Sequence, residues 1–227
     1  MLPLRDNIPS TSPPVIMLGL IAVNVLVFLY QMLLPEKALQ QFLLTYALIP
    51  VHFLEAPPLS WERWQPVLTS MFLHGGILHI VGNMWYLWLF GDNVEDAMGH
   101  VRFLLFYLLC GAAAAVAHVA FNPTSFIPTV GASGAISGVM GAYLMLFPHA
   151  RIITLVPLGF FSTAIEVRAW FFLVFWAFLQ LLNATMLTQE GVGGVAWWAH
   201  LGGFIAGAIL GPALRRPSYR LPRTSKW

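Results

Sequence analysis

Long apolar runs constrain the fold of this chain more than any other feature of its sequence. Hydrophobic residues make up 59% of the 227 residues and charged residues only 9%, whereas a soluble domain carries charge at about a quarter of its positions. Each run has about the length that a helix needs to cross the hydrocarbon core of a bilayer. The sequence therefore predicts an all-α integral membrane protein, a bundle of six transmembrane helices. The expected spans are approximately residues 15–34, 71–90, 103–121, 131–147, 169–187 and 195–214.

These spans are expected to form one membrane domain over residues 15–214. A polar lead at 1–14 precedes the domain and a basic tail at 215–227 follows it. With the N-terminus in the cytoplasm, nine of the 11 Lys and Arg residues fall on the cytoplasmic side, and only Lys37 and Arg63 fall outside. Because cytoplasmic segments carry an excess of these residues, both termini are predicted to be cytoplasmic. The compact core without added domains favours a bacterial cytoplasmic membrane.

The segments between the spans carry most of the polar residues. Residues 35–70 are predicted to be an amphipathic connection, whose Trp61 and Trp64 suit a membrane–water interface. Residues 91–96 are expected to be an acidic loop, and residues 148–168 a charged one. A net charge of +2 without a basic, aromatic-rich stripe argues against nucleic acid as a partner, so the expected surroundings are the lipid bilayer.

Four polar residues interrupt the spans at comparable depths. Ser133 lies near the outer end of the fourth span, and His200 lies about five residues into the sixth, roughly 7–8 Å deep. His79 and Asn83 are one helical turn apart in the outer half of the second span, so they share a face. In the predicted orientation all four lie below the same membrane surface. An ionisable group inside a membrane span indicates a functional site.

Stripes of glycine predict that the serine and the histidine meet. Gly203 and Gly207 follow His200 at three and seven residues, which places them on one stripe of the sixth span. Gly134 and Gly138 form a comparable small face on the fourth span. Small residues three or four apart let membrane helices approach closely. The two spans are therefore expected to pack tightly.

Each polar residue also has a structural explanation when it is taken alone. A serine in a glycine-rich helix commonly bonds the backbone of its own helix. Asn83 can join two helices by a hydrogen bond, and His200 alone is as consistent with structure as with catalysis. Together, at one depth, Ser133, His200 and Asn83 favour a functional site.

Three motifs resemble those of the rhomboid intramembrane serine proteases: Gly131–Gly134 (GASG), His79-x-x-x-Asn83, and His200 followed by Gly203 and Gly207. The resemblance covers the whole six-span core and implies a six-helix bundle that cleaves transmembrane protein substrates near the outer membrane face. It implies Ser133 as nucleophile and His200 as general base. It further implies an oxyanion hole formed by His79, Asn83 and the backbone N–H of Ser133, with Gly131 shaping the loop. No cofactor and no metal are expected.

The pair is expected to be a dyad, because none of the six expected spans contains an Asp or Glu to orient His200. Some family members have a tyrosine one turn after the serine that stacks on the histidine, but this position is Ser137 here, so another residue is expected to hold His200. The main alternative is a catalytically inactive relative that binds membrane clients. A transporter is disfavoured because the expected spans contain no carboxylates and the sequence shows no repeated halves. A metal-dependent protease is disfavoured because the sequence has no H-E-x-x-H motif.

Overall fold

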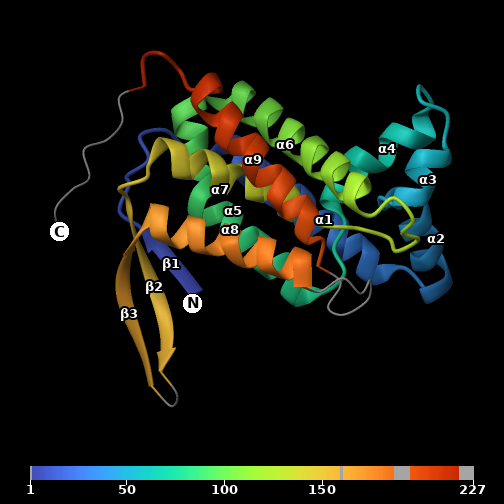
Figure 1. The fold of residues 1–227 in the computed structure, drawn as a ribbon, viewed down its shortest axis with the longest axis horizontal. Coiled ribbons are helices and arrows are strands. Elements are labelled where there is room, and N and C mark those ends of the chain that lie inside the picture. Colours follow the sequence, from blue (N-terminus) through green and yellow to red (C-terminus); the bar gives the residue numbers. More distant parts are fainter. Residues whose placement is uncertain (1, 159–160, 187–194, 220–227) are drawn as a thin grey trace.

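The computed structural model describes residues 2–158, 161–186 and 195–219. Six long helices of the described residues lie side by side along most of the molecule (Figure 1). Five of them follow their predicted spans closely, whereas the helix predicted at 71–90 begins at Ile77 and continues to Met98. The predicted end of the fifth span at Leu187, the glycines at 191–194 and the basic residues Arg220, Arg223 and Lys226 lie outside the described residues. The six helices are α1 (Val15–Leu33), α5 (Ile77–Met98), α6 (His100–Phe121), α7 (Ser133–Leu146), α8 (Ala169–Met186) and α9 (Trp197–Leu214).

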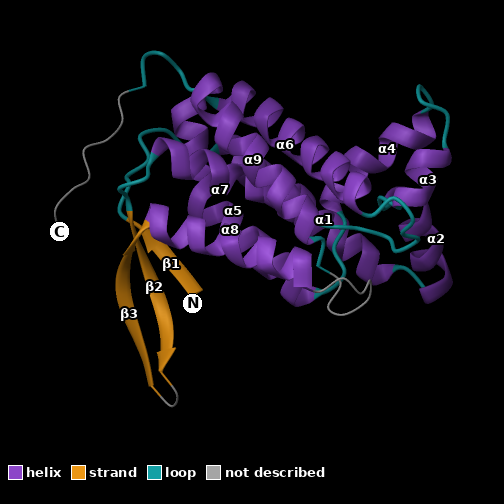
Figure 2. Cartoon of the chain, in the orientation of Figure 1, coloured by secondary structure: helices purple, strands orange, loops and turns teal. Residues whose placement is uncertain are grey.

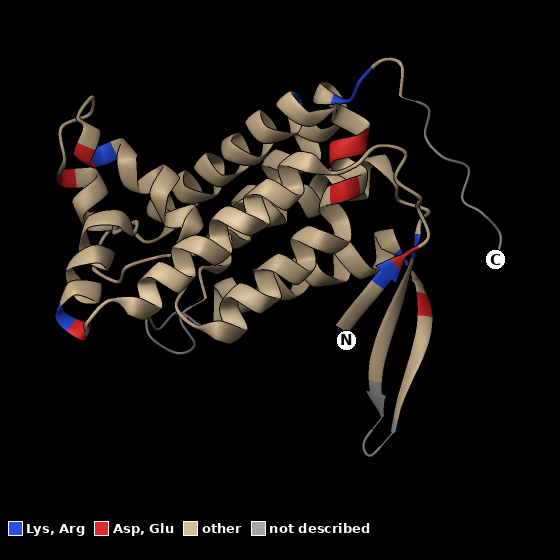
Figure 3. Ribbon diagram, turned by 180° about the vertical axis from the view of Figure 1, so that it is seen from behind, with Lys and Arg blue, Asp and Glu red and all other residues tan. Residues whose placement is uncertain are grey.

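The lengths and compositions of these helices support an integral membrane protein. Within the described ranges, α1, α6, α8 and α9 are each long and apolar enough to cross a membrane. A fifth candidate is the bent pair made by residues 61–72 and α5, and α7 is a shorter apolar helix. Charged residues gather at the two ends of the ribbon and leave its middle almost free of charge (Figure 3). A charge-free middle is what the hydrocarbon core of a bilayer requires.

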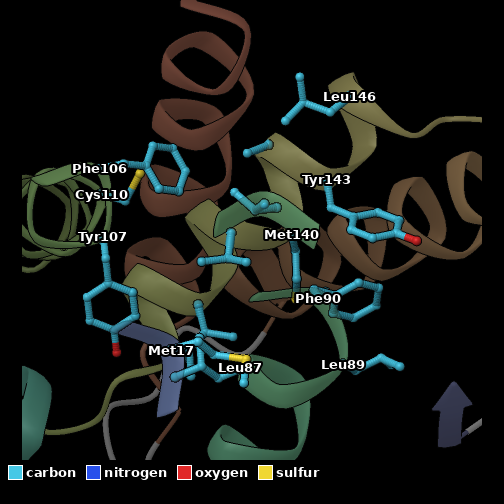
Figure 4. Packing of buried hydrophobic residues seen from close by; sticks show 14 of the residues in the cluster. Met17, Leu87, Leu89, Phe90, Phe106, Tyr107, Cys110, Met140, Tyr143 and Leu146 are labelled. Carbon is cyan, nitrogen blue, oxygen red and sulfur yellow. The ribbon is translucent and has the colours of Figure 1, made fainter. Parts of the chain in front are cut away.

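Helix α7 lies at the centre of the bundle. Nearly all of its residues are buried, including the large side chains Met140 and Tyr143. The core around them takes Phe90 from α5 and Phe106 from α6, together with Cys110 one turn further along α6 (Figure 4). The serine at the first position of α7 therefore belongs to a helix that is almost completely buried.

Helices α7 and α9 approach each other backbone to backbone, as the glycine stripes predict. A Cβ atom added at Gly207 would lie 1.9 Å from the carbonyl oxygen of Gly138. One added at Gly203 would lie 2.0 Å from the carbonyl oxygen of Gly134. No larger residue fits at either place unless the helices move apart. We call this contact the glycine seam.

The expected acidic loop at residues 91–96 is instead the last part of α5, so this prediction was wrong. Glu95 and Asp96 are both about 1% exposed. Glu95 accepts hydrogen bonds from the backbone N–H groups of Ile16 and Met17 at 2.9 and 2.7 Å. The first N–H groups of a helix have no intrahelical acceptor and favour negative charge. Glu95 can therefore be buried within α5, because its carboxylate accepts hydrogen bonds from the first N–H groups of α1.

The expected charged loop at residues 148–168 and the polar lead together form a sheet. Strands β1 (Leu2–Asp6), β2 (Arg151–Leu158) and β3 (Phe161–Arg168) pair in that order, and both pairings are antiparallel. β2 is rich in Ile, Leu, Val and Thr, which favour strands. The sheet lies at one end of the helices, beside the N-terminus (Figure 2).

The connection at residues 35–70 folds into short helices at the end of the bundle opposite the sheet (Figure 1). Trp61 and Trp64 lie on one of them and are exposed, as suits an interface. The indole N–H of Trp64 donates to the carbonyl of Pro58 at 2.7 Å. These elements are α2 (Glu36–Tyr46), α3 (Pro50–Glu55), α4 (Trp61–Thr69) and the 3-10 helix η1 (Ser70–Phe72).

Candidate active site

Ser133 is the first residue of α7 and directly follows a loop whose backbone favours glycine at position 131. Gly131 has φ +129°, a value that residues with a side chain rarely adopt. A Cβ atom at Gly131 would also lie 2.8 Å from Nε2 of His79. The backbone N–H of Gly131 donates to the carbonyl of Ser70 at 2.9 Å, which ties the loop to η1. The loop therefore delivers Ser133 close to the face of α5 that carries His79.

The side chains of Ser133 and His200 are in hydrogen-bond contact across the glycine seam. Ser133 Oγ lies 2.8 Å from His200 Nε2, although the residues are 67 positions apart in the sequence. Ser133 comes from the start of α7, and His200 from the first turn of α9. If Nε2 carries no proton, the serine hydroxyl donates to it, which is the ground state of a serine–base pair.

Two residues of α8 hold His200 from its other side, and the sequence reasoning missed both. Nδ1 of His200 lies 2.7 Å from Oε1 of Gln180. The ring of Trp176 lies against the imidazole, with centroids 6.0 Å apart and planes inclined by 34°. Trp176 and Gln180 are four residues apart and share a face of α8. The signal was present, because Gln180 is a polar residue in the middle of an apolar span.

The hydroxyl of Ser137, one turn after Ser133, is hydrogen-bonded to the backbone and not to the histidine. It donates to the backbone carbonyl of Ser133 at 2.6 Å, a bond within the same helix. The position at which some members of the resembled family carry tyrosine therefore has a structural role here, and α8 supplies residues that contact His200 instead.

The structure places His79 and Asn83 beside the Gly131 loop. The backbone N–H of Gly75 donates to Nδ1 of His79 at 3.4 Å. Asn83 Nδ2 lies 2.9 Å from Nε2 of His74. His74 is itself fixed, because its backbone N–H donates to Gln31 Oε1 at 3.0 Å and its carbonyl accepts from Gln31 Nε2 at 3.2 Å. His74 and Gln31 thus support Asn83, and the sequence reasoning did not assign them that part.

The N–H of Ser133 completes this group of donors. Ser133 is the first residue of α7, so its N–H has no acceptor within the helix. His79, Asn83 and Ser133 line the same cavity, beside the Gly131 loop. Such donors stabilise negative charge that develops on a substrate oxygen.

These residues share one cavity of about 780 Å³. Such a volume is in the range of small-molecule and substrate sites. Among the described residues that line the cavity there is no Asp or Glu, so the polar groups available for chemistry are hydroxyl, imidazole and amide groups. The residues of the site that line it are His79, Asn83, Gly131, Ser133, Trp176 and His200.

Comparison with known proteins gives a match to the Rhomboid domain family over residues 60–217. The presenilin-associated rhomboid-like protein A of Danio rerio, named as mitochondrial, is 30% identical over 154 residues, which cover 66% of this chain and 38% of the relative. The rhomboid protease GluP of Bacillus subtilis is 40% identical over 97 residues, 43% of this chain and 18% of the relative. The human presenilin-associated rhomboid-like protein, also named as mitochondrial, is 28% identical over 198 residues, 83% of this chain and 45% of the relative.

The chain spans less than half the length of these curated relatives. Two of these relatives are named as mitochondrial, and the third comes from a bacterium. The expectation of a bacterial cytoplasmic membrane is therefore not supported. The apolar helices support a membrane protein without indicating which membrane it occupies.

Proposed function

Because the chain belongs to the rhomboid family, we propose that it is an intramembrane serine endopeptidase. Its proposed substrates are membrane proteins, which it cleaves in or beside a transmembrane helix, near the outer face of the membrane. The observation that carries the proposal is the distance of 2.8 Å between Ser133 Oγ and His200 Nε2, at the edge of a cavity inside an apolar bundle. A serine hydroxyl becomes a useful nucleophile only when a base takes its proton.

The proposed reaction uses Ser133 as nucleophile and His200 as general base. As Ser133 Oγ attacks the scissile carbonyl carbon, its proton moves to His200 Nε2 and the carbonyl oxygen becomes an oxyanion. His200 then returns the proton to the leaving amine, which breaks the peptide bond and leaves an acyl-enzyme on Ser133. Water, activated by the same histidine, hydrolyses the ester and restores the serine.

The proposed oxyanion hole combines the backbone N–H of Ser133 with the side chains of His79 and Asn83. The Asn83 amide has two N–H groups, so it can keep its contact with His74 and still offer one to the substrate. His74 Nε2 acts as the acceptor in that contact and fixes the amide nitrogen on this side. Removal of one oxyanion donor costs about 3–4 kcal/mol in a serine protease, so Asn83→Ala is expected to lower kcat by about 10² to 10³.

Labelling with a fluorophosphonate probe tests the nucleophile. Wild-type protein in lipid is expected to be labelled and to cleave a model transmembrane substrate, whereas Ser133→Ala and His200→Ala are expected to do neither. Ser137→Ala is the matched control, because this serine lies one turn away and bonds only the backbone of its own helix. A folded wild-type protein that neither labels nor cleaves would refute the protease proposal and favour a client-binding relative.

The proposal also includes an orientation with both termini in the cytoplasm, because nine of the 11 Lys and Arg residues then fall on that side. A reporter that is active only outside the cytoplasm, fused to the C-terminus, is expected to stay inactive. Activity of that fusion would reverse the orientation and place the cavity on the other face.

A further inference from the structure

Gln180 is a polar residue buried in the apolar helix α8, so its presence there needs an explanation. The outward faces of this helix are exposed apolar side chains, among them Phe171, Val174 and Phe178. Gln180 instead lies on the inward stripe and is only 6% exposed. An amide buried away from water costs free energy unless it is hydrogen-bonded. Oε1 of Gln180 lies 2.7 Å from Nδ1 of His200.

This hydrogen bond determines which nitrogen of His200 carries the proton. Oε1 of Gln180 is a carbonyl oxygen and can only accept, so Nδ1 must donate. A neutral imidazole has one N–H, and Nε2 is then left with a lone pair directed at Ser133 Oγ, 2.8 Å away. We propose that Gln180 is a positioning residue of the dyad, which holds His200 in the tautomer that can take the serine proton. This inference rests on the protease function proposed above.

Gln180 and Trp176 together also fix the orientation of the ring. The hydrogen bond restrains the imidazole at Nδ1, and Trp176 lies against its face at 6.0 Å between centroids. Both side chains come from one face of α8, four residues apart. Rotation of the ring by half a turn would break the bond to Gln180 and the bond to Ser133 at the same time.

The hydrogen bond is expected to strengthen during the reaction. When Nε2 takes the proton of Ser133, His200 becomes a cation, and its Nδ1–H then donates a charge-assisted bond to Gln180. An interaction that is stronger in the transition state than in the ground state raises kcat. Gln180 is not among the residues that line the cavity, so its loss is expected to leave KM nearly unchanged.

A purely structural role makes a different prediction. If the hydrogen bond of Gln180 only joins α8 to α9, every replacement that weakens it should lower the stability of the fold and should not lower kcat beyond that. If it positions His200, a residue that keeps an acceptor oxygen at the same reach should restore activity. Gln180→Leu removes the acceptor at similar size, and Gln180→Glu keeps one. Asn183→Leu is the matched control, because it removes an amide from the same helix three residues away.

The experiment measures kcat and KM for a model transmembrane substrate in proteoliposomes, beside thermal unfolding of each variant. We expect Gln180→Leu to lower kcat by about 10- to 100-fold, a part of what general-base catalysis contributes, with KM within about two-fold of wild type. Gln180→Glu is expected to recover most of that loss, and Asn183→Leu to match the wild type. Wild-type kcat in Gln180→Leu, or equal losses in the Leu and Glu variants, would overturn the inference.

Nitrogen-15 NMR of labelled histidine tests the tautomer without using the variants of Gln180. The signal of His200, identified by its loss in His200→Ala, is expected to show protonation at Nδ1. Protonation at Nε2 would overturn the positioning role even if the enzyme is active. An inactive wild type with Nδ1 protonated would instead refute the protease function on which the inference depends, so the two failures are distinguishable.

Discussion

Replacement of Gly207 by alanine is expected to disable the site from a distance. Gly207 is seven residues beyond His200 on α9, so it is not a group of the proposed chemistry. A Cβ atom there would lie 1.9 Å from the carbonyl oxygen of Gly138, where real Cβ contacts stay above 3.0 Å. That oxygen belongs to the backbone of a buried helix and cannot rotate away. The two helices must therefore separate by about 1 Å, a forced expansion typical of overpacking.

The magnitude follows from the geometry of the seam. Overpacking costs about 1–3 kcal/mol of stability. A separation of about 1 Å, transmitted to the Ser133–His200 contact of 2.8 Å, would lengthen it to about 3.8 Å, which is no longer a hydrogen bond. A misplacement of about 1 Å can cost about 100-fold in rate. We therefore expect kcat to fall by about 100-fold while the protein remains folded.

The assay compares Gly207→Ala with Gly19→Ala by thermal unfolding in detergent and by cleavage in proteoliposomes. Gly19 is a matched control, because it also lies within a helix but a Cβ atom there would have no neighbour within 4 Å. Alanine favours a helix over glycine by up to about 1 kcal/mol, so the control is expected to be neutral or slightly stabilised. If Gly207→Ala cleaves at the wild-type rate, the glycine seam does not set the Ser133–His200 distance.

Three further changes test other parts of the structure. Gly131→Ala, at φ +129° and with its Cβ 2.8 Å from His79 Nε2, is expected to lose at least about 100-fold in kcat, and an active variant would contradict the loop argument. Trp176→Leu is expected to lower kcat by about 10-fold with little change in Tm, because the ring of His200 is then less restrained. A clear fall in Tm together with the loss of kcat would instead indicate a packing role only. Burial raises the pKa of Asp6, in β1, from 3.8 to about 7, so the folded state keeps a proton that the unfolded chain releases between these values. The free energy of unfolding is then greatest below about pH 4 and falls by up to about 4 kcal/mol as pH rises to about 7, with about 3 kcal/mol of that fall above pH 5. The wild-type Tm is therefore expected to be lower at pH 8 than at pH 5; Asp6→Asn should lack this difference, and an unchanged difference would assign it to another group.

The sequence predicts the helices because the bilayer requires a simple property, a run of apolar residues of sufficient length. It also predicts that Ser133 and His200 come together, because glycines at helical spacing mark the faces of α7 and α9 that meet. Both inferences use patterns within one helix. They do not depend on knowing which residues lie opposite.

The parts that sequence reasoning missed depend on partners far away in the chain. Residues 91–96 were expected to be a loop because carboxylates are usually solvated. In the structure Glu95 accepts from the N–H groups that begin α1, almost 80 residues earlier. The strand β1 likewise pairs with β2 across about 150 residues. A single sequence carries no local sign of either pairing.

Gln180 is a different kind of omission, because the rule that found His200 applies to it equally. Both are buried polar residues in apolar spans, and such residues in membranes usually have a partner with a function. The absence of a carboxylate in the expected spans excludes a triad but leaves the residue expected to hold His200 unidentified. An amide oxygen meets the same need, since it accepts a hydrogen bond and can do nothing else.

The proposed dyad therefore depends on two separate structural constraints. In this proposal the glycine seam between α7 and α9 sets the distance from Ser133 to His200, and Gln180 and Trp176 of α8 set the orientation and tautomer of the imidazole. A change in the seam is expected to reduce stability and rate together, because the same backbone contact supports both. A change at Gln180 is expected to reduce the rate with KM unchanged, because that hydrogen bond gains strength only when His200 becomes charged. Variants in the glycine seam therefore test the Ser133–His200 distance, and variants at Gln180 test which nitrogen of His200 carries the proton.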